Sequence, residues 1–326
     1  MVLIDEYDKP LLDVLGEEQE LTNRNILRGF YGTFKAVDAS LRFVLLTGVT
    51  KFSQITVFSG FNQPKDISMH SKYDAICGIT EEELHAVFAD PIVQMAKKMQ
   101  YTVDEMKAVL KKQYDGYHFS AGMLDIYNPF SIINAFDKMQ IDSYWYQSGT
   151  PTYLARLIDG HHINVQKLIG QPYEPQYFMD YRADAEDPLA MFYQSGYLTI
   201  KGYSQRTRRY TLDFPNDEVR QGFVALTANG YFKIPEAAAA NWVANLSEML
   251  DNGDLDSVRD AYTSFLASIP YEANKDVRAL DFETHYQYTF YLINRLLSCY
   301  TTLIEKQNSK GRADIIIEGL HDIYIF

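Results

Sequence analysis

Two short apolar runs near the start of the chain, separated by an amphipathic segment, constrain its fold more than any other feature. Residues 2–4 and 41–47 are predominantly hydrophobic and of strand length, as expected for strands buried on both faces. The segment between them has Thr22 as a helix-capping residue. Its apolar side chains recur three or four positions apart, at Ile26, Phe30, Phe34 and Val37. We therefore expect a parallel strand–helix–strand unit.

Candidate chemistry is carried by the residues that follow these two strands. Asp5 and Glu6 come directly after the first strand and give it the form of a Walker B strand. In such a strand the first acid would hold Mg²⁺ and the second would polarise the attacking water. Thr47 ends the neighbouring strand, where a γ-phosphate sensor would lie, and Lys51 follows as a candidate nucleotide contact. An ordinary strand that ends in a carboxylate is the alternative.

The region after these strands is expected to be mostly helical. Thr80–Glu83 and Thr102–Glu105 have the sequence of capping boxes, which satisfy free N–H groups at a helix start. Asn-Pro at residues 128–129 and Thr-Pro at residues 150–151 supply a capping residue followed by proline in the first turn. Each of these four points is therefore predicted to begin a helix.

A hairpin is predicted further along the chain. Residues 197–203 and 210–214 are strand-like and are joined by a polar turn, and residues 218–226 follow as a helical run. This order would suit a winged-helix module. Three arginines gather at the predicted hairpin tip: Arg206, Arg208 and Arg209. A solvated turn is the alternative to a functional basic cluster.

Composition narrows the functional classes. The balance of 30 Lys and Arg against 43 Asp and Glu gives a net charge of −13, which argues against a broad basic surface that neutralises many phosphates. No apolar run reaches the length of a membrane helix, and the N-terminus lacks a secretion signal, so we expect a cytoplasmic location. Cys77 and Cys299 lie far apart and indicate neither a disulfide framework nor a zinc site.

A long series of motifs resembles one known family, in which an AAA-ATPase-like domain is joined to a PD-(D/E)xK nuclease-like domain. The segments that carry the resemblance occur in the family's order: residues 4–11, 46–53, 58–62, 77–80, 114–119, 127–130 and 145–151. The first of them looks like the Walker B segment and the second is similar to the sensor strand. The resemblance covers nearly all of the chain.

The resemblance implies an α/β fold with a mostly α middle region. Residues 1–60 would be a partial P-loop ATPase core, residues 61–195 its helical region, residues 196–270 a winged-helix-like and helical segment, and residues 271–326 a partial PD-(D/E)xK nuclease-like domain. It also implies ATP and Mg²⁺ as cofactors and nucleic acid as a partner, and the lack of a long apolar run predicts no membrane partner. The oligomeric state stays open.

The nuclease-like residues follow from the same resemblance. Nucleases of this type place an Asp at the start of one strand and Glu-x-Lys on the next, so that carboxylates hold Mg²⁺ while the lysine orients a water. Asp314 lies in a segment that looks like the first strand, and Glu283 is in the position of a further metal-binding acid. Residues 321–326 look like the lead-in to Glu-x-Lys. A simple turn-ending acid is the alternative for Asp314.

Two parts of these sites are missing from the 326 residues. There is no Gly-Lys pair, and therefore no phosphate-binding P-loop, and there is no Glu-x-Lys after Asp314. We expect a chain truncated at both ends that is inactive by itself, derived from an ATPase coupled to a nuclease-like domain. The alternatives are a non-enzymatic binding module, with a decayed nuclease fold and a winged helix, or a mis-started or split gene product.

Two aromatic segments carry no assignable chemistry. Residues 114–119 and 127–130 place aromatic side chains beside glycine or proline, a pattern typical of loops that are locked against a core. His118 lies within the first of them. We expect this histidine to be packed or solvent-facing rather than catalytic.

Overall fold

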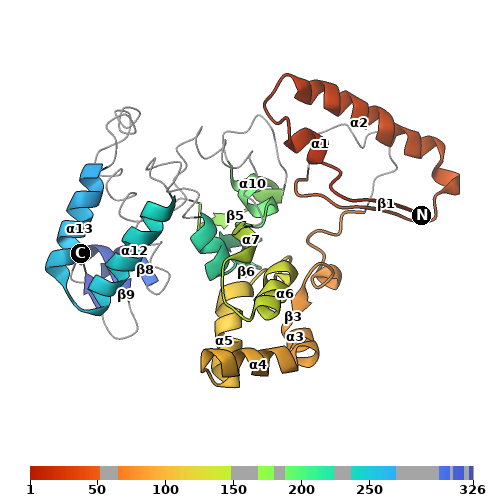
Figure 1. The fold of residues 1–326 in the computed structure, drawn as a ribbon. Coiled ribbons are helices and arrows are strands. Elements are labelled where there is room, and N and C mark those ends of the chain that lie inside the picture. The colour runs from red at the N-terminus through yellow and green to blue at the C-terminus, as the bar shows by residue number, and fades with distance from the viewer. Residues whose placement is uncertain are drawn as a thin grey trace. The chain divides into compact units, whose positions relative to one another are not determined.

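The computed structural model is a mixed α/β structure (Figure 1). It describes residues 1–51, 65–147, 168–179, 188–223, 236–268, 301–308, 311–318 and 323–325. The described residues up to Asn216 form one compact unit, and those from Asp217 onward form another. Within these residues, no helix combines the length and apolar character that crossing a membrane would need.

The first unit begins with the predicted parallel pair. Strand β1 (Val2–Ile4) pairs with β2 (Val44–Leu46), and Ile4 lies opposite Leu46. Helices α1 (Lys9–Leu12) and α2 (Gln19–Ala36) and the 3₁₀ turn η1 (Asp38–Ser40) connect the two strands (Figure 1). The predicted parallel strand–helix–strand unit is therefore present. The expectation that its strands are buried on both faces was wrong, because Leu3 is 60% exposed and no residue of either strand is fully buried.

Helix α2 differs from its prediction in both start and orientation. It begins at Gln19 after Glu18, so Thr22 lies inside the helix instead of capping it. Phe34 is buried as predicted, but Ile26 and Phe30 are 64% and 52% exposed. Val37 is also exposed, and Tyr31 is buried in place of these side chains. The predicted apolar stripe was wrong, because α2 packs through the face that carries Tyr31 and Phe34. The neighbouring face, which the spacing of Ile26 and Phe30 favoured, is exposed.

The middle of the first unit is helical, as predicted. Its elements are η3 (Ser71–Tyr73), β3 (Ile79–Thr80), α3 (Glu81–Val87), α4 (Ala89–Met99), α5 (Val103–Tyr114), β4 (Ile126–Tyr127), α6 (Pro129–Lys138) and α7 (Tyr144–Gln147). Both capping boxes form, with Thr80 before α3 and Thr102 before α5. The Asn128 side chain caps α6, with proline in the first turn. The fourth predicted start, at residues 150–151, lies outside the described residues.

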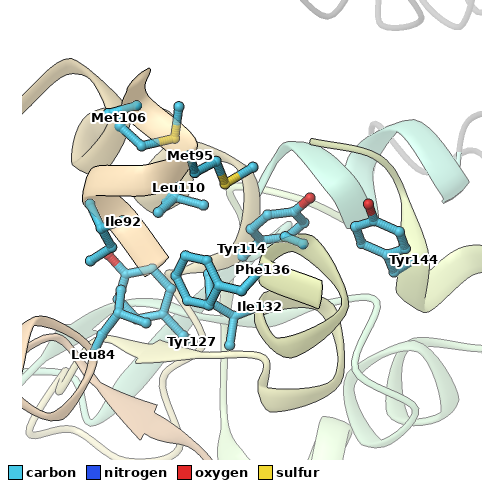
Figure 2. Close-up of a cluster of buried hydrophobic side chains, with 12 residues drawn as sticks. Leu84, Ile92, Met95, Met106, Leu110, Tyr114, Tyr127, Ile132, Phe136 and Tyr144 are labelled. Atoms are coloured by element: carbon cyan, nitrogen blue, oxygen red, sulfur yellow. The ribbon is translucent and has the colours of Figure 1, made fainter. Parts of the chain in front are cut away.

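These helices enclose a dense hydrophobic core, shown in Figure 2. Helices α4 and α5 supply its centre, and Ile92 and Leu110 are almost fully buried. The rings of Phe88 and Phe136 stack with centroids 5.2 Å apart. The Tyr114 hydroxyl donates to the Asp142 carbonyl oxygen at 2.8 Å, so this buried phenol is satisfied.

The predicted hairpin forms a small sheet in the same unit. Strands β6 (Thr199–Ser204) and β7 (Arg209–Asp213) are antiparallel, and β5 (Pro172–Tyr173) pairs with the other edge of β7. Helices α9 (Pro175–Met179) and α10 (Leu189–Gln194) precede the hairpin. Residues 217–223 are helical, in keeping with the run expected from residue 218. The winged-helix assignment itself stays a prediction.

The described residues of the second unit comprise the helical residues 217–223, two longer helices and an antiparallel sheet. Helices α12 (Glu236–Asp251) and α13 (Leu255–Ser268) pack through Trp242 and Phe265, whose ring centroids lie 4.6 Å apart. The sheet has the order β10-β9-β8, with β8 (Thr301–Asn308), β9 (Gly311–Glu318) and β10 (Ile323–Ile325). Strands β9 and β10 were predicted and β8 was not.

Candidate functional site

The ends of β1 and β2 bring the first two predicted site residues together. Because the strands are parallel and in register, the residues that follow Ile4 and Leu46 lie side by side. The Thr47 hydroxyl donates to Asp5 Oδ1. Backbone hydrogen bonds continue the pairing, since Thr47 N–H donates to the Ile4 carbonyl oxygen at 2.9 Å and Tyr7 N–H to the Thr47 carbonyl oxygen at 2.9 Å. The juxtaposition expected from the sequence is thus observed.

The carboxylate of Asp5 is oriented through one of its two oxygens. Oδ1 accepts from the Thr47 hydroxyl and from Glu6 N–H, the latter at 3.0 Å. Oδ2 has no hydrogen-bond partner among the described residues, and the side chain is exposed. With the carboxylate oriented through Oδ1, its other oxygen, Oδ2, is a suitable ligand for Mg²⁺. In nucleotide sites Mg²⁺ binds one or two carboxylates together with phosphate oxygens.

Glu6 has an unusual backbone conformation. Its φ is 49°, in the left-handed region that non-glycine residues rarely adopt. Such a conformation costs about 1 kcal/mol, and residues of this kind cluster at functional sites. The carboxylate is exposed and lies 3.7 Å from Lys9 Nζ, an ion pair too exposed to contribute much stability. The Glu6 carboxylate is therefore accessible to water.

Lys51 lies against other elements of the first unit. Its ammonium contacts Asp66 Oδ2 at 2.5 Å, and its N–H donates to Gln194 Oε1 at 2.7 Å. Although partial burial opposes it, hydrogen bonding from Lys51 and Ser68 lowers the pKa of Asp66. Lys51 also lines an open cavity of about 470 Å³. The other lining residues are Glu174, Pro175, Gln176, Met179, Thr207 and Arg208. The role of Lys51 in nucleotide binding stays a prediction.

The predicted nuclease-like residues are only partly described. Asp314 lies in β9, the central strand of the C-terminal sheet, and Glu283 lies outside the described residues. Elsewhere in the described part of the chain, no group of three or more His, Cys, Asp or Glu side chains is arranged to hold a metal ion. The assignment of Asp314 and Glu283 to a metal site therefore stays a prediction.

A buried contact behind the Asp5–Thr47 pair was not predicted. Asp8 is 0% exposed, and its Oδ2 accepts from Thr50 N–H at 2.5 Å and from the Thr50 hydroxyl at 2.7 Å. The Tyr7 hydroxyl donates to the Thr50 carbonyl oxygen at 2.7 Å. The segment after β1 is therefore joined to the segment after β2 at a second point.

His118 is packed, in agreement with the sequence interpretation. Its Nδ1 lies 2.6 Å from the Ile200 carbonyl oxygen and its Nε2 lies 2.6 Å from Asp125 Oδ1. The two contacts hold the ring between the backbone of β6 and the carboxylate of Asp125. Lys201 Nζ donates to the Gly116 carbonyl oxygen at 2.7 Å. The segment 114–119 thus fastens α5 to β6.

Asp115, in the same segment, is buried, and its surroundings disfavour the charged form of its carboxylate. Burial raises its pKa to about 6, and the nearby charges of Asp125 and Glu81 act in the same direction. Lys111 Nζ lies 3.8 Å from its Oδ2, too far for a strong hydrogen bond. The folded chain therefore holds a proton on Asp115 at pH values where the unfolded chain has lost it.

We expect the Asp115→Asn variant to lose part of the pH dependence of folding. In the wild type the contribution of Asp115 to the free energy of unfolding should fall as the pH rises from about 4 to about 6, by about 3 kcal/mol in total. The variant should lack this contribution, because the amide does not titrate. Urea unfolding across a pH series measures both slopes, with the exposed Asp137→Asn as the matched control. If the free energy of unfolding changed equally with pH in the wild type and in Asp115→Asn, the raised pKa of Asp115 would be contradicted.

Comparison with known proteins finds a family match at each end of the chain. Residues 1–58 match the family described as "Predicted AAA-ATPase", and residues 281–326 match the PD-(D/E)XK nuclease superfamily. A protein from Azotobacter chroococcum mcd 1, described as "Uncharacterized protein in vnfD 5'region", is 32% identical over 330 residues. The alignment covers 100% of this chain and 61% of that relative. No solved structure matches. The chain therefore combines an AAA-ATPase-like region at its N-terminus with a region of the PD-(D/E)XK nuclease superfamily at its C-terminus.

Proposed function

We propose that Asp5, Glu6 and Thr47 form the hydrolysis side of a Mg²⁺-dependent ATP site, and that the nuclease-superfamily region acts on nucleic acid. The observation that carries the first part is the hydrogen bond from Thr47 to Asp5 at the ends of two parallel strands. Ligand sites in open α/β sheets lie at the carboxyl ends of the strands, which is where these residues gather.

Each of the three residues has a separate task in this proposal. Asp5 offers Oδ2 to Mg²⁺ or to a water bound to it, while Oδ1 is held by Thr47 and Glu6 N–H. Glu6 accepts a hydrogen bond from the attacking water and so orients it towards the γ-phosphate. Thr47 keeps Asp5 in one orientation and lies beside the γ-phosphate. Bound Mg²⁺ would neutralise charge on the phosphate oxygens.

The phosphate-binding lysine of a P-loop is not among these 326 residues, because the chain has no Gly-Lys pair. Activity is therefore tested in the full-length protein. We expect it to hydrolyse ATP with Mg²⁺ and not with EDTA, and we expect Asp5→Asn to lower the rate at least about 100-fold. Asp13→Asn, an exposed acid in the same segment, is the matched control and should retain the rate. Absence of Mg²⁺-dependent turnover in the wild type would refute the ATPase proposal.

The second part of the proposal places a Mg²⁺ ion at Asp314 and Glu283. The support for it is the superfamily match over residues 281–326 and the position of Asp314 in the central strand β9. Full-length protein should cleave DNA or RNA with Mg²⁺, and both Asp314→Asn and Glu283→Gln should abolish cleavage. If nucleic acid is bound but remains intact with Mg²⁺ or Mn²⁺, a binding role replaces the nuclease role.

A further inference from the structure

The buried contact between Asp8 and Thr50 connects the two segments that carry the candidate hydrolysis residues. Asp8 lies three positions after Asp5, and Thr50 lies three positions after Thr47. The Asp8 carboxylate receives two hydrogen bonds from Thr50, one from its N–H and one from its hydroxyl, and is 0% exposed.

The position of Asp8 indicates that its carboxylate serves this contact and not its own helix. Asp8 stands at the N-cap of α1, and its carbonyl oxygen accepts from Leu12 N–H at 3.0 Å. At this position an aspartate usually accepts a hydrogen bond from an N–H of the first helical turn, which stabilises the helix. Here the side chain makes no capping hydrogen bond. The carboxylate is turned towards Thr50 at the expense of that local stabilisation.

Gly48 allows the close approach that the contact needs. A Cβ atom at this position would lie 2.5 Å from Asp8 Oδ1 and 2.7 Å from the Tyr7 ring. No side chain fits there without displacing Asp8 or the segment that follows β2. The same Asp8 Oδ1 is buried and has no hydrogen-bond partner among the described residues. Keeping a carboxylate in this place is costly, which favours a functional reason for it.

We propose that Asp8 is a positioning residue for ATP hydrolysis, which acts through Thr50 to hold Thr47 against Asp5. This inference rests on the proposed ATPase function. Thr47 and Thr50 belong to one short segment, so an anchor at Thr50 limits how far Thr47 can move from Asp5 Oδ1. Loss of the anchor would leave the Asp5 carboxylate and the γ-phosphate contact misaligned. Displacements of about 1 Å can cost about 100-fold in rate.

The test compares four variants of the full-length protein in steady-state ATP hydrolysis. Asp8→Asn should lower kcat at least about 10-fold and change KM less than about threefold, because the contact orients groups that act in the transition state. Thr50→Val removes the hydroxyl but keeps the N–H, and should lower kcat by a smaller factor. Thr50→Ser restores the hydroxyl and should recover most of the rate. Asp13→Asn, an exposed acid of the same segment, is the control.

The outcomes separate this inference from the function on which it rests. If the wild type hydrolyses ATP and Asp8→Asn has the kcat of the Asp13→Asn control, the positioning role is refuted while the ATPase proposal stands. If the wild type has no Mg²⁺-dependent turnover, both proposals fall. If Asp8→Asn does not fold, the comparison of Thr50→Val with Thr50→Ser decides: equal kcat values refute the role, and a lower kcat for the valine variant supports it.

Discussion

Replacing Glu6 by Gln in the full-length protein is expected to lower kcat for ATP hydrolysis at least about 100-fold while nucleotide affinity stays within about threefold. The substitution keeps the size of the side chain and removes only the charge that polarises water. The left-handed backbone of Glu6, with φ at 49°, is retained because the change is confined to the end of the side chain.

The measurement pairs steady-state phosphate release with equilibrium binding of a fluorescent ATP analogue. Glu18→Gln is the matched control, because Glu18 is exposed, lies close in sequence and makes no capping hydrogen bond through its side chain. The control should have the wild-type rate. A Glu6→Gln variant that turns over ATP as fast as the control would show that the attacking water is oriented by another group.

Replacing Ile92 by Ala is expected to destabilise the first unit by about 3 kcal/mol. Ile92 is 1% exposed and lies in the core formed by α4, α5 and α6 (Figure 2), so the truncation leaves a cavity in a densely packed region. The loss should be visible as a lower midpoint in urea unfolding followed by circular dichroism.

The next residue of the same helix provides the control for this prediction. Val93 is 51% exposed, and Val93→Ala should change the free energy of unfolding by less than about 0.5 kcal/mol. Similar effects of the two substitutions would mean that the helices are not packed as described, because only the buried position should be sensitive to lost volume.

The features that could be predicted from the sequence were those encoded by neighbouring residues. Capping boxes depend on two residues three positions apart, and the boxes at Thr80 and Thr102 formed as expected. The pairing of β1 with β2 could be predicted because two apolar strands joined by a helix usually pair in parallel through a right-handed crossover. The position of Thr47 beside Asp5 followed from that pairing alone.

The features that could not be predicted depend on long-range packing, which decides between alternatives that are similar in the local sequence. Helix α2 has aromatic residues at positions 30, 31 and 34, and spacing does not decide which face packs. The orientation of Asp8 could not be inferred either, because an aspartate before a helix ordinarily caps it. Its partner Thr50 lies 42 positions away. Strand β8 was missed because residues 301–308 mix polar and apolar residues without a clear alternation.

The most direct test of the central claim is an experimental structure of the full-length protein with Mg²⁺ and a non-hydrolysable ATP analogue. We predict that Asp5 contacts Mg²⁺ either directly, at about 2.1 Å, or through one bound water, and that Thr47 lies beside the γ-phosphate. Glu6 should contact the water that faces this phosphate. A nucleotide bound elsewhere in the protein, with the Asp5–Thr47 hydrogen bond remote from both the metal and the phosphates, would contradict the claim.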